Sequence, residues 1–155
     1  MKNTIVIFVL ILSLIGCKNK SEEAKVTPTQ IMESNESAAL LQVGCYAYNA
    51  NKSAIKFEIM DIKDDIIKGN LKYRLAEKDA NIGTFEGVLI DDILLGDYTF
   101  QSEGLTSTRE VIFKIINGQL IEGYGNMDEE GTHFVNTDHV TFTSTMPLTK
   151  MNCIN

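Results

Sequence analysis

The chain has 155 residues, 44% of them hydrophobic, and carries a formal net charge of −7. No cluster of Lys and Arg interrupts the acidic composition, and such clusters are what proteins use to neutralise nucleic-acid phosphates. We therefore expect no nucleic-acid partner. The length of the chain suits one folded domain.

The first sixteen residues have the composition of an export signal. Lys2 precedes an apolar run from Ile5 to Ile15, in which Ser13 is the one polar residue. A membrane-spanning helix needs roughly 20 apolar residues, so this run is too short to remain as a transmembrane anchor. We predict that residues 1–16 are a signal peptide.

The end of this run, Leu14-Ile15-Gly16-Cys17, resembles the lipobox of bacterial lipoproteins. The resemblance implies that Cys17 receives a diacylglyceryl group, that the leader is cut before it, and that the new amine is acylated, for example with palmitate. Several acyl chains would anchor the protein to the membrane essentially permanently. The residue that follows the cysteine is Lys18, whereas an Asp at this position retains enteric lipoproteins in the inner membrane. We therefore expect an outer-membrane lipoprotein, facing either the periplasm or the cell surface.

Residues 17–42 contain many Ser, Glu, Asn and Thr residues and have no strong apolar period. This composition predicts a flexible tether between the lipidated cysteine and the folded domain. A short helix that starts at Pro28 and ends at Leu41 is the alternative.

From residue 43 onward the apolar residues recur with a period of two, which is typical of strands with one buried face. In 66–75, for example, Leu71 and Tyr73 alternate with Asn70 and Lys72. No segment keeps an apolar stripe at helical spacing. We predict eight strands, at 43–48, 54–60, 66–75, 82–90, 93–101, 109–116, 119–125 and 138–143.

Short turns separate these strands, so neighbours in the sequence should pair in antiparallel fashion. Asn117-Gly118 is the preferred pair for a two-residue hairpin. Asp64-Asp65 and Asp91-Asp92 also separate apolar runs, and 78–81 forms a looser reversal. The expected fold of residues 43–155 is an all-β domain, an eight-stranded antiparallel up-and-down β-barrel, with a β-sandwich as the alternative. Glycines inside the strands would allow the sharp coiling of a barrel.

Two cysteines remain if Cys17 carries lipid. An exported chain faces an oxidising compartment, so we predict a disulfide between Cys45 and Cys153. The alternative is two separate buried thiols. In a closed barrel the first strand lies beside the last segment, which would bring these cysteines together.

The predicted arrangement of eight strands resembles the lipocalin and avidin architecture, whose small barrels are filled with side chains or hold one small ligand. Gly44-Cys45-Tyr46 stands where lipocalins carry Gly-x-Trp, and this chain has no Trp. Segments 98–104, 109–111 and 122–125 are similar to a group of uncharacterised bacterial lipoproteins. That similarity implies the fold and the envelope address, and no activity.

A group of polar residues surrounds the longest turn that we expect in the meander. These side chains could orient a polar ligand at one mouth of the barrel. The simpler interpretation, which we favour, is an ion pair between Arg109 and a carboxylate that orders the turn and contributes about 0 to 1 kcal/mol. The candidate residues are Tyr98, Ser102, Glu103, Arg109 and Glu110.

The two histidines are candidate metal ligands. His133 and His139 flank Asp138 and follow the acidic run 128–130, but the spacing matches no known ligand pattern. A solvated acidic loop explains the same residues, and we predict no metal or cofactor.

No nucleophile with a neighbouring base is apparent, and the chain lacks a Gly-x-Ser-x-Gly motif. We expect a non-enzymatic envelope lipoprotein that acts by binding or as an accessory component, with an envelope protein or a small ligand as partner. One alternative is a carrier of a small apolar ligand. In that case inward aromatic residues, which otherwise form the core, would line the lumen. A hydrolase is the second alternative. The aromatic residues in question are Tyr73, Phe85, Tyr98 and Phe100.

Overall fold

The structure is a computed structural model that describes residues 40–153. The predicted signal peptide, Cys17 and residues 18–39 of the predicted tether lie outside this range. No helix among the described residues is long and apolar enough to cross a membrane. Leu41, which we expected in the tether, is instead part of the core, with 1% of its surface exposed. The folded domain therefore includes residues before the predicted boundary at 43.

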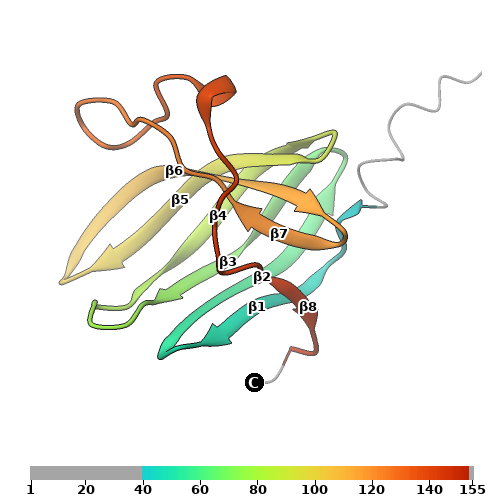
Figure 1. Ribbon diagram of the computed structural model, residues 1–155, viewed down its shortest axis with the longest axis horizontal. Helices are drawn as coiled ribbons and strands as arrows, with labels where there is room; N and C mark the ends of the chain where they lie inside the picture. Colours follow the sequence, from blue (N-terminus) through green and yellow to red (C-terminus); the bar gives the residue numbers. More distant parts are fainter. Residues whose placement is uncertain (1–39, 154–155) are drawn as a thin grey trace, which may run out of the picture. The chain divides into compact units, whose positions relative to one another are not determined.

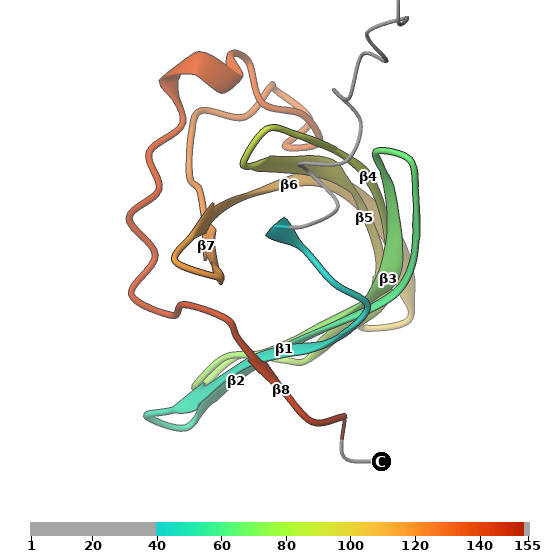
Figure 2. The same ribbon diagram turned by 90° about the vertical axis from the view of Figure 1, so that its right-hand side faces the viewer.

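Eight antiparallel strands form one sheet that curls into a nearly closed barrel (Figures 1 and 2). This confirms the predicted fold class. A single 3₁₀ turn, η1 (Thr137–His139), lies between the last two strands. The strands are β1 (Gly44–Ala50), β2 (Ser53–Lys63), β3 (Ile66–Arg74), β4 (Asn81–Ile90), β5 (Ile93–Ser102), β6 (Leu105–Ile116), β7 (Gln119–Glu122) and β8 (Thr149–Met151).

The strand order is β7-β6-β5-β4-β3-β2-β1-β8, a meander in which β8 returns to pair with β1. Leu120 of β7 and Leu148, just before β8, exchange backbone hydrogen bonds of 3.0 and 2.9 Å. Because β8 already pairs with β1, these two bonds bring the edges of the sheet together. Figure 2 shows the resulting ring of strands.

The barrel interior is filled with apolar side chains because each strand directs alternate residues inward. In β3, buried and exposed residues alternate without exception. The rings of Phe57, Phe85 and Phe113 meet at the centre, with centroids 5.0 Å apart for Phe57 and Phe85 and 5.7 Å apart for Phe57 and Phe113. Burying a side chain of this size contributes about 1.5 to 3 kcal/mol to stability.

Two strand glycines make room for this aromatic core. Gly87 and Gly96 lie opposite one another on β4 and β5. A Cβ atom on Gly96 would lie 2.7 Å from Cζ of Phe85, and one on Gly87 would lie 2.8 Å from Cα of Gly96. Both positions therefore require the absence of a side chain.

The tight turns follow the predicted chemistry. Asn117 and Gly118 have φ values of 52° and 75°, so both adopt the left-handed conformation of a type I′ hairpin. The same conformation occurs at Asp64 and Asp91, with φ values of 54° and 52°.

The turn between β5 and β6 differs from our expectation. Glu103 and Gly104 form a two-residue hairpin with positive φ, and β6 begins at Leu105 instead of 109. The sequence Leu-Thr-Ser-Thr at 105–108 lacks buried residues, so the apolar alternation that marks the rest of β6 is missing there. The long turn that we expected around Arg109 does not exist.

The predicted eighth strand at 138–143 is also wrong, since the eighth strand is Thr149–Met151. Segment 138–143 contains the end of η1, and Thr141 makes an isolated bridge to Tyr124. Val140 and Phe142 pack against Gly123, and Nζ of Lys114 lies 5.9 Å from the centroid of the Phe142 ring. The apolar pattern of 138–143 therefore reflects packing against the outside of β6 and β7.

Cys45 and Cys153 form a disulfide with Cα atoms 5.2 Å apart, as predicted. Cys45 lies in β1, where its partner on β8 is Met151. The disulfide thus fastens the short last strand to the first one, next to the seam of the barrel.

Candidate ligand-binding site

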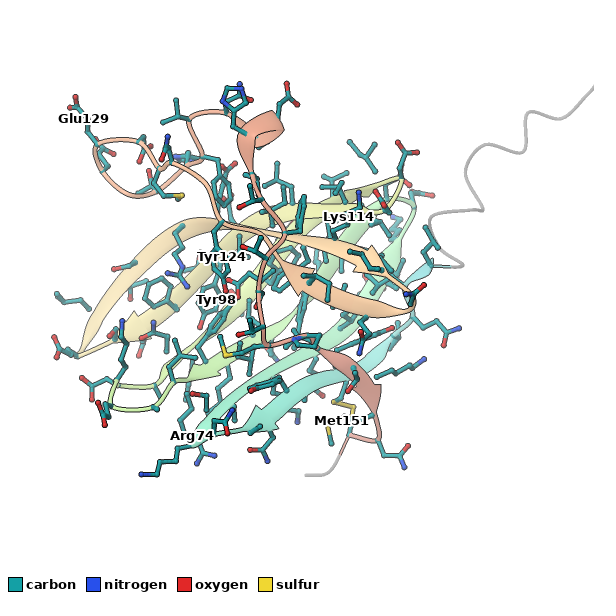
Figure 3. The ribbon with its side chains drawn as sticks, in the orientation of Figure 1. Arg74, Tyr98, Lys114, Tyr124, Glu129 and Met151 are labelled. Atoms are coloured by element: carbon teal, nitrogen blue, oxygen red, sulfur yellow. A yellow bond between two sulfur atoms is a disulfide. The ribbon has the colours of Figure 1, made fainter. Side chains whose placement is uncertain are left out.

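Four residues with polar side chains lie inside the barrel, at inward positions of four strands. Its members are Tyr73 on β3, Tyr98 on β5, Arg109 on β6 and Glu122 on β7. Tyr98 and Arg109 are cross-strand partners. Figure 3 shows Tyr98 within the barrel and Arg74, by contrast, at the outer surface. We call these four residues the interior polar cluster.

Glu122 is the buried carboxyl of the cluster, with 8% of its surface exposed. The hydroxyl of Tyr73 donates a hydrogen bond of 2.9 Å to its Oε1 atom. Burial raises the pKa of Glu122, although the bond from Tyr73 and the charge of Arg109 act in the opposite direction. Burial and the neighbouring carboxyl of Glu122 together raise the pKa of Tyr73 well above its usual value.

Arg109 is surrounded by aromatic rings. Its Cζ atom lies 5.6 Å from the ring centroids of Tyr73 and Phe100 and 6.0 Å from that of Tyr98. The rings of Tyr98 and Phe100 are stacked, with centroids 4.8 Å apart. Cation–π contacts of this kind hold a guanidinium in place without using its N–H donors.

Two polar atoms of the cluster are buried without a hydrogen-bond partner among the described residues, Nε of Arg109 and the hydroxyl oxygen of Tyr98. Burial also raises the pKa of Tyr98 to about 12, against the opposing effect of Arg109. A buried polar group without a partner destabilises a protein by about 1 to 3 kcal/mol. Such groups call for an explanation, and a ligand that pairs with them is one.

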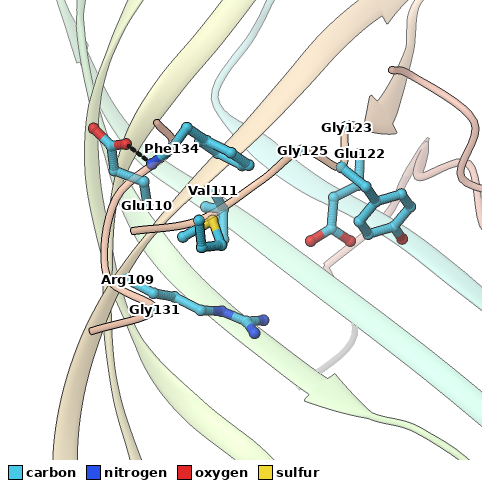
Figure 4. Close-up of a pocket in the computed structure, with 10 residues that line it drawn as sticks. Arg109, Glu110, Val111, Glu122, Gly123, Gly125, Gly131 and Phe134 are labelled. Atoms are coloured by element: carbon cyan, nitrogen blue, oxygen red, sulfur yellow. Dashed lines mark hydrogen bonds between the residues drawn. The ribbon is translucent and has the colours of Figure 1, made fainter. Parts of the chain in front are cut away.

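Two cavities meet the cluster, and Arg109, Glu122 and Tyr124 line both. The first, of about 200 Å³, extends toward the segment after β7. Figure 4 shows Arg109 and Glu122 reaching into this cavity from different strands. The second, of about 240 Å³, extends toward Tyr73 and Met146. Arg109 and Glu122 therefore border open space on two sides, whereas Tyr98 lines neither cavity.

Residues 127–134, which follow β7, form part of the wall of the first cavity and are hydrogen-bonded to β6. The backbone N–H of Glu110 donates to the carbonyl oxygen of Thr132 (2.7 Å), and the N–H of Phe134 donates to Oε2 of Glu110 (2.8 Å). Within the segment, the N–H and the hydroxyl of Thr132 donate to Asp128, and these bonds hold the pKa of Asp128 at about 2.

The structure brings together only part of the predicted ligand group. Tyr98 and Arg109 belong to the interior polar cluster, and Glu110 supports the cavity wall. Ser102 and Glu103 lie at the tip of the β5–β6 hairpin, away from the cluster in the strand register. The ion pair that we favoured for Arg109 is not among those formed by the described residues, because its side chain points inward toward the rings.

Glu122 was not among the predicted site residues, and Tyr73 was predicted to belong to the apolar core. A signal for Glu122 was present, since it follows Leu120 by two residues and so occupies an inward position of a strand. A charged residue at such a position is unusual, because burial of an unpaired charge is unfavourable. Tyr73 occupies the inward face of its own segment, where we assigned it to the core.

The predicted histidine group does not assemble as one cluster. Nδ1 of His133 lies 3.4 Å from Oδ2 of Asp128. Asp138 and His139 lie in η1, where the N–H of Asp138 donates to Asn136. His133 instead approaches carboxylates of β5 and β6.

Comparison of the chain with protein-family models, with curated proteins and with solved structures found no match.

Proposed function

We propose that this chain is a non-enzymatic, lipid-anchored binding protein of the bacterial cell envelope, whose barrel takes up a small polar ligand at the interior polar cluster. The observation that carries the proposal is that Arg109, whose buried Nε has no hydrogen-bond partner among the described residues, lines both cavities together with the buried carboxyl of Glu122. Ligand sites characteristically combine a cavity with a few convergent polar groups.

The charges of the cluster define what the ligand must offer. Arg109 supplies N–H donors, and Glu122 supplies a carboxyl that is held by Tyr73. A ligand lying between them needs an acceptor for the guanidinium and a polar group for the carboxyl. Hydrogen bonds to a buried charged group contribute about 1.5 to 3 kcal/mol each, enough to orient a small molecule.

The cavity sizes favour a polar ligand over the apolar cargo of a carrier. Both cavities at the cluster are smaller than the roughly 300 Å³ at which pockets for drug-sized ligands usually begin. The apolar centre of the barrel is occupied by Phe57, Phe85 and Phe113. Larger hollows of about 540 and 470 Å³ adjoin Ile82 and Thr84, two exposed residues of β4, on the outer face.

A hydrolase receives less support. The sulfur atoms of Cys45 and Cys153 are joined, so neither is a nucleophilic thiol. His133 and His139 are exposed in the segment after β7 and do not line either cavity at the cluster.

The proposed location in the cell envelope rests on the lipobox-like sequence that ends at Cys17 and on Lys18, which favours the outer membrane. The disulfide is consistent with an exported domain, because disulfides persist in oxidising compartments. Mass spectrometry of the native chain tests the address. We expect a mature N-terminus at Cys17 carrying acyl chains, and no acylation in Cys17→Ser. An unmodified N-terminus at Met1 would contradict it.

Native mass spectrometry of the full chain, isolated from its own envelope, tests ligand binding. We compare the wild type with Arg109→Lys and with Arg74→Lys, a matched control because Arg74 is exposed on β3. A small bound molecule should be present in the wild type and in Arg74→Lys, and lost in Arg109→Lys.

Two outcomes would overturn the ligand proposal. One is the absence of a bound small molecule from all three proteins. The other is a molecule that all three retain equally. If the bound molecule were a fatty acyl compound instead of a polar one, the carrier alternative would be favoured.

A further inference from the structure

Carboxylates form a row across the outside of the barrel, on adjacent strands. Glu86 of β4 lies opposite Asp97 of β5, and Asp97 lies opposite Glu110 of β6. Like charges directly opposite one another on neighbouring strands destabilise a sheet. The row therefore needs positive charge.

Lysines supply that charge to other carboxylates of the outer face, but not to Asp97 and Glu110. Nζ of Lys68 lies 2.8 Å from Oε1 of Glu86, and Nζ of Lys114 lies 3.4 Å from Oδ2 of Asp92. Neither Asp97 nor Glu110 takes part in an ion pair within residues 40–153. The group that approaches them is the imidazole of His133.

One ligand atom from each of Asp97, Glu110 and His133 lies within 4.8 Å of the other two. The three side chains come from β5, from β6 and from the segment after β7. Donor atoms around a tetrahedral ion with bonds of 2.0 to 2.2 Å are roughly 3.4 Å apart, so small side-chain rotations would close the site.

The backbone near His133 holds the imidazole in this position. Glu110 binds the residues on both sides of it, accepting from the N–H of Phe134 through Oε2 and donating its own N–H to Thr132. Nδ1 of His133 also lies 2.9 Å from Oγ1 of Thr132 and 3.4 Å from Oδ2 of Asp128. Contact of one ring nitrogen with a carboxylate is the usual means of orienting a metal-binding histidine.

We propose that Asp97, Glu110 and His133 bind one divalent transition-metal ion on the outer face of the barrel. One imidazole and two carboxylates suit Zn²⁺ and its neighbours better than Ca²⁺ or Mg²⁺, which prefer oxygen ligands throughout. Three protein ligands leave a further position for water. The ion would join the segment that contains Phe134 to β5 and β6, behind the wall of the first cavity.

Calorimetric titration of the full chain with Zn²⁺ alone tests the site. We expect one ion to bind in the micromolar range. Asp97→Asn and His133→Ala should each weaken binding by at least about tenfold. His139→Ala is the matched control, because His139 is exposed in η1 and is not part of the group, and its affinity should be unchanged. Circular dichroism and melting temperature without metal establish that each variant is folded.

The chain has two histidines, which permits a second and independent measurement. In an NMR spectrum of the imidazole C–H groups, Zn²⁺ should shift the signals of His133 and leave those of His139 in place. Failure to bind Zn²⁺ below about 1 mM would overturn the proposal. So would binding that survives both Asp97→Asn and His133→Ala, since the ion would then lie elsewhere. Ligand binding at Arg109 is measured in a separate experiment, so the result for one proposal does not decide the other.

Discussion

Tyr73 and Glu122, 49 residues apart in the sequence, are joined by a hydrogen bond of 2.9 Å inside the barrel. The bond runs from β3 to β7, and both partners are buried. It places a carboxyl next to Arg109 without a direct ion pair between them.

Glu122→Gln should change how stability depends on pH. Burial raises the pKa of Glu122 above its ordinary value of 4.5, so the folded state binds the proton more tightly than the unfolded chain. Its stabilising contribution is therefore present in full below pH 4.5 and is lost as pH rises through the raised folded-state pKa. Gln keeps an acceptor for Tyr73 and does not titrate. The free energy of unfolding of the variant, minus that of the wild type, should increase with pH across this window.

Urea denaturation at a series of pH values measures this difference. Glu129→Gln, which removes an exposed carboxyl of the segment after β7, controls for the loss of one negative charge. A difference that is flat, or that falls as pH rises, is incompatible with a raised pKa at Glu122.

Tyr73→Phe should destabilise the protein by about 1 to 3 kcal/mol, because it leaves Glu122 buried without its donor. Tyr48→Phe is the control, since the hydroxyl of Tyr48 makes no hydrogen bond within residues 40–153 and should contribute little. In the double variant with Glu122→Gln, the effects should not add, because the two residues share one bond. Additive effects in this double-mutant cycle would refute the coupling.

Tyr98→Phe should not destabilise the protein, in contrast to Tyr73→Phe. The hydroxyl of Tyr98 is buried without a partner, so its removal should leave the unfolding free energy of the ligand-free protein unchanged or raise it by about 1 kcal/mol. Chemical denaturation of the ligand-free protein measures this effect. A loss of more than about 1 kcal/mol of stability would indicate that the hydroxyl has a protein partner.

Replacing both Cys45 and Cys153 with Ser should lower stability by about 4 to 5 kcal/mol, the entropy expected for a closed loop of roughly 100 residues. The observed separation is 108 residues. Denaturation with and without reductant provides the comparison, since the wild type under reducing conditions should approach the variant. Equal stability of the oxidised wild type and the variant would count against a stabilising role.

The candidate site was only partly predictable. The polarity of Arg109 and Tyr98 indicates a site, but the sequence predicts a turn before Arg109, because 105–108 lacks the apolar alternation of a buried strand. Whether a residue lies in a strand or in a turn decides whether it points into the barrel. Nothing in the sequence marks Asp97 as a metal ligand, because its position opposite Glu110 depends on the register between β5 and β6.

The sequence by itself determined the local features of this protein. Alternating apolar residues specify strands such as β3, Asn117-Gly118 specifies a hairpin, and a pair of cysteines in the domain specifies one disulfide. These features depend on neighbouring residues or on composition.

Only the tertiary structure decided which distant residues meet. Segment 138–143 has the alternation of a strand, yet it packs on the outside of β6 and β7, and three residues at 149–151 complete the sheet. The contact between Tyr73 and Glu122 likewise requires the sheet to curl until β3 and β7 face one another. The physical reason is that closure depends on the summed coiling and register of every strand, which no single segment contains.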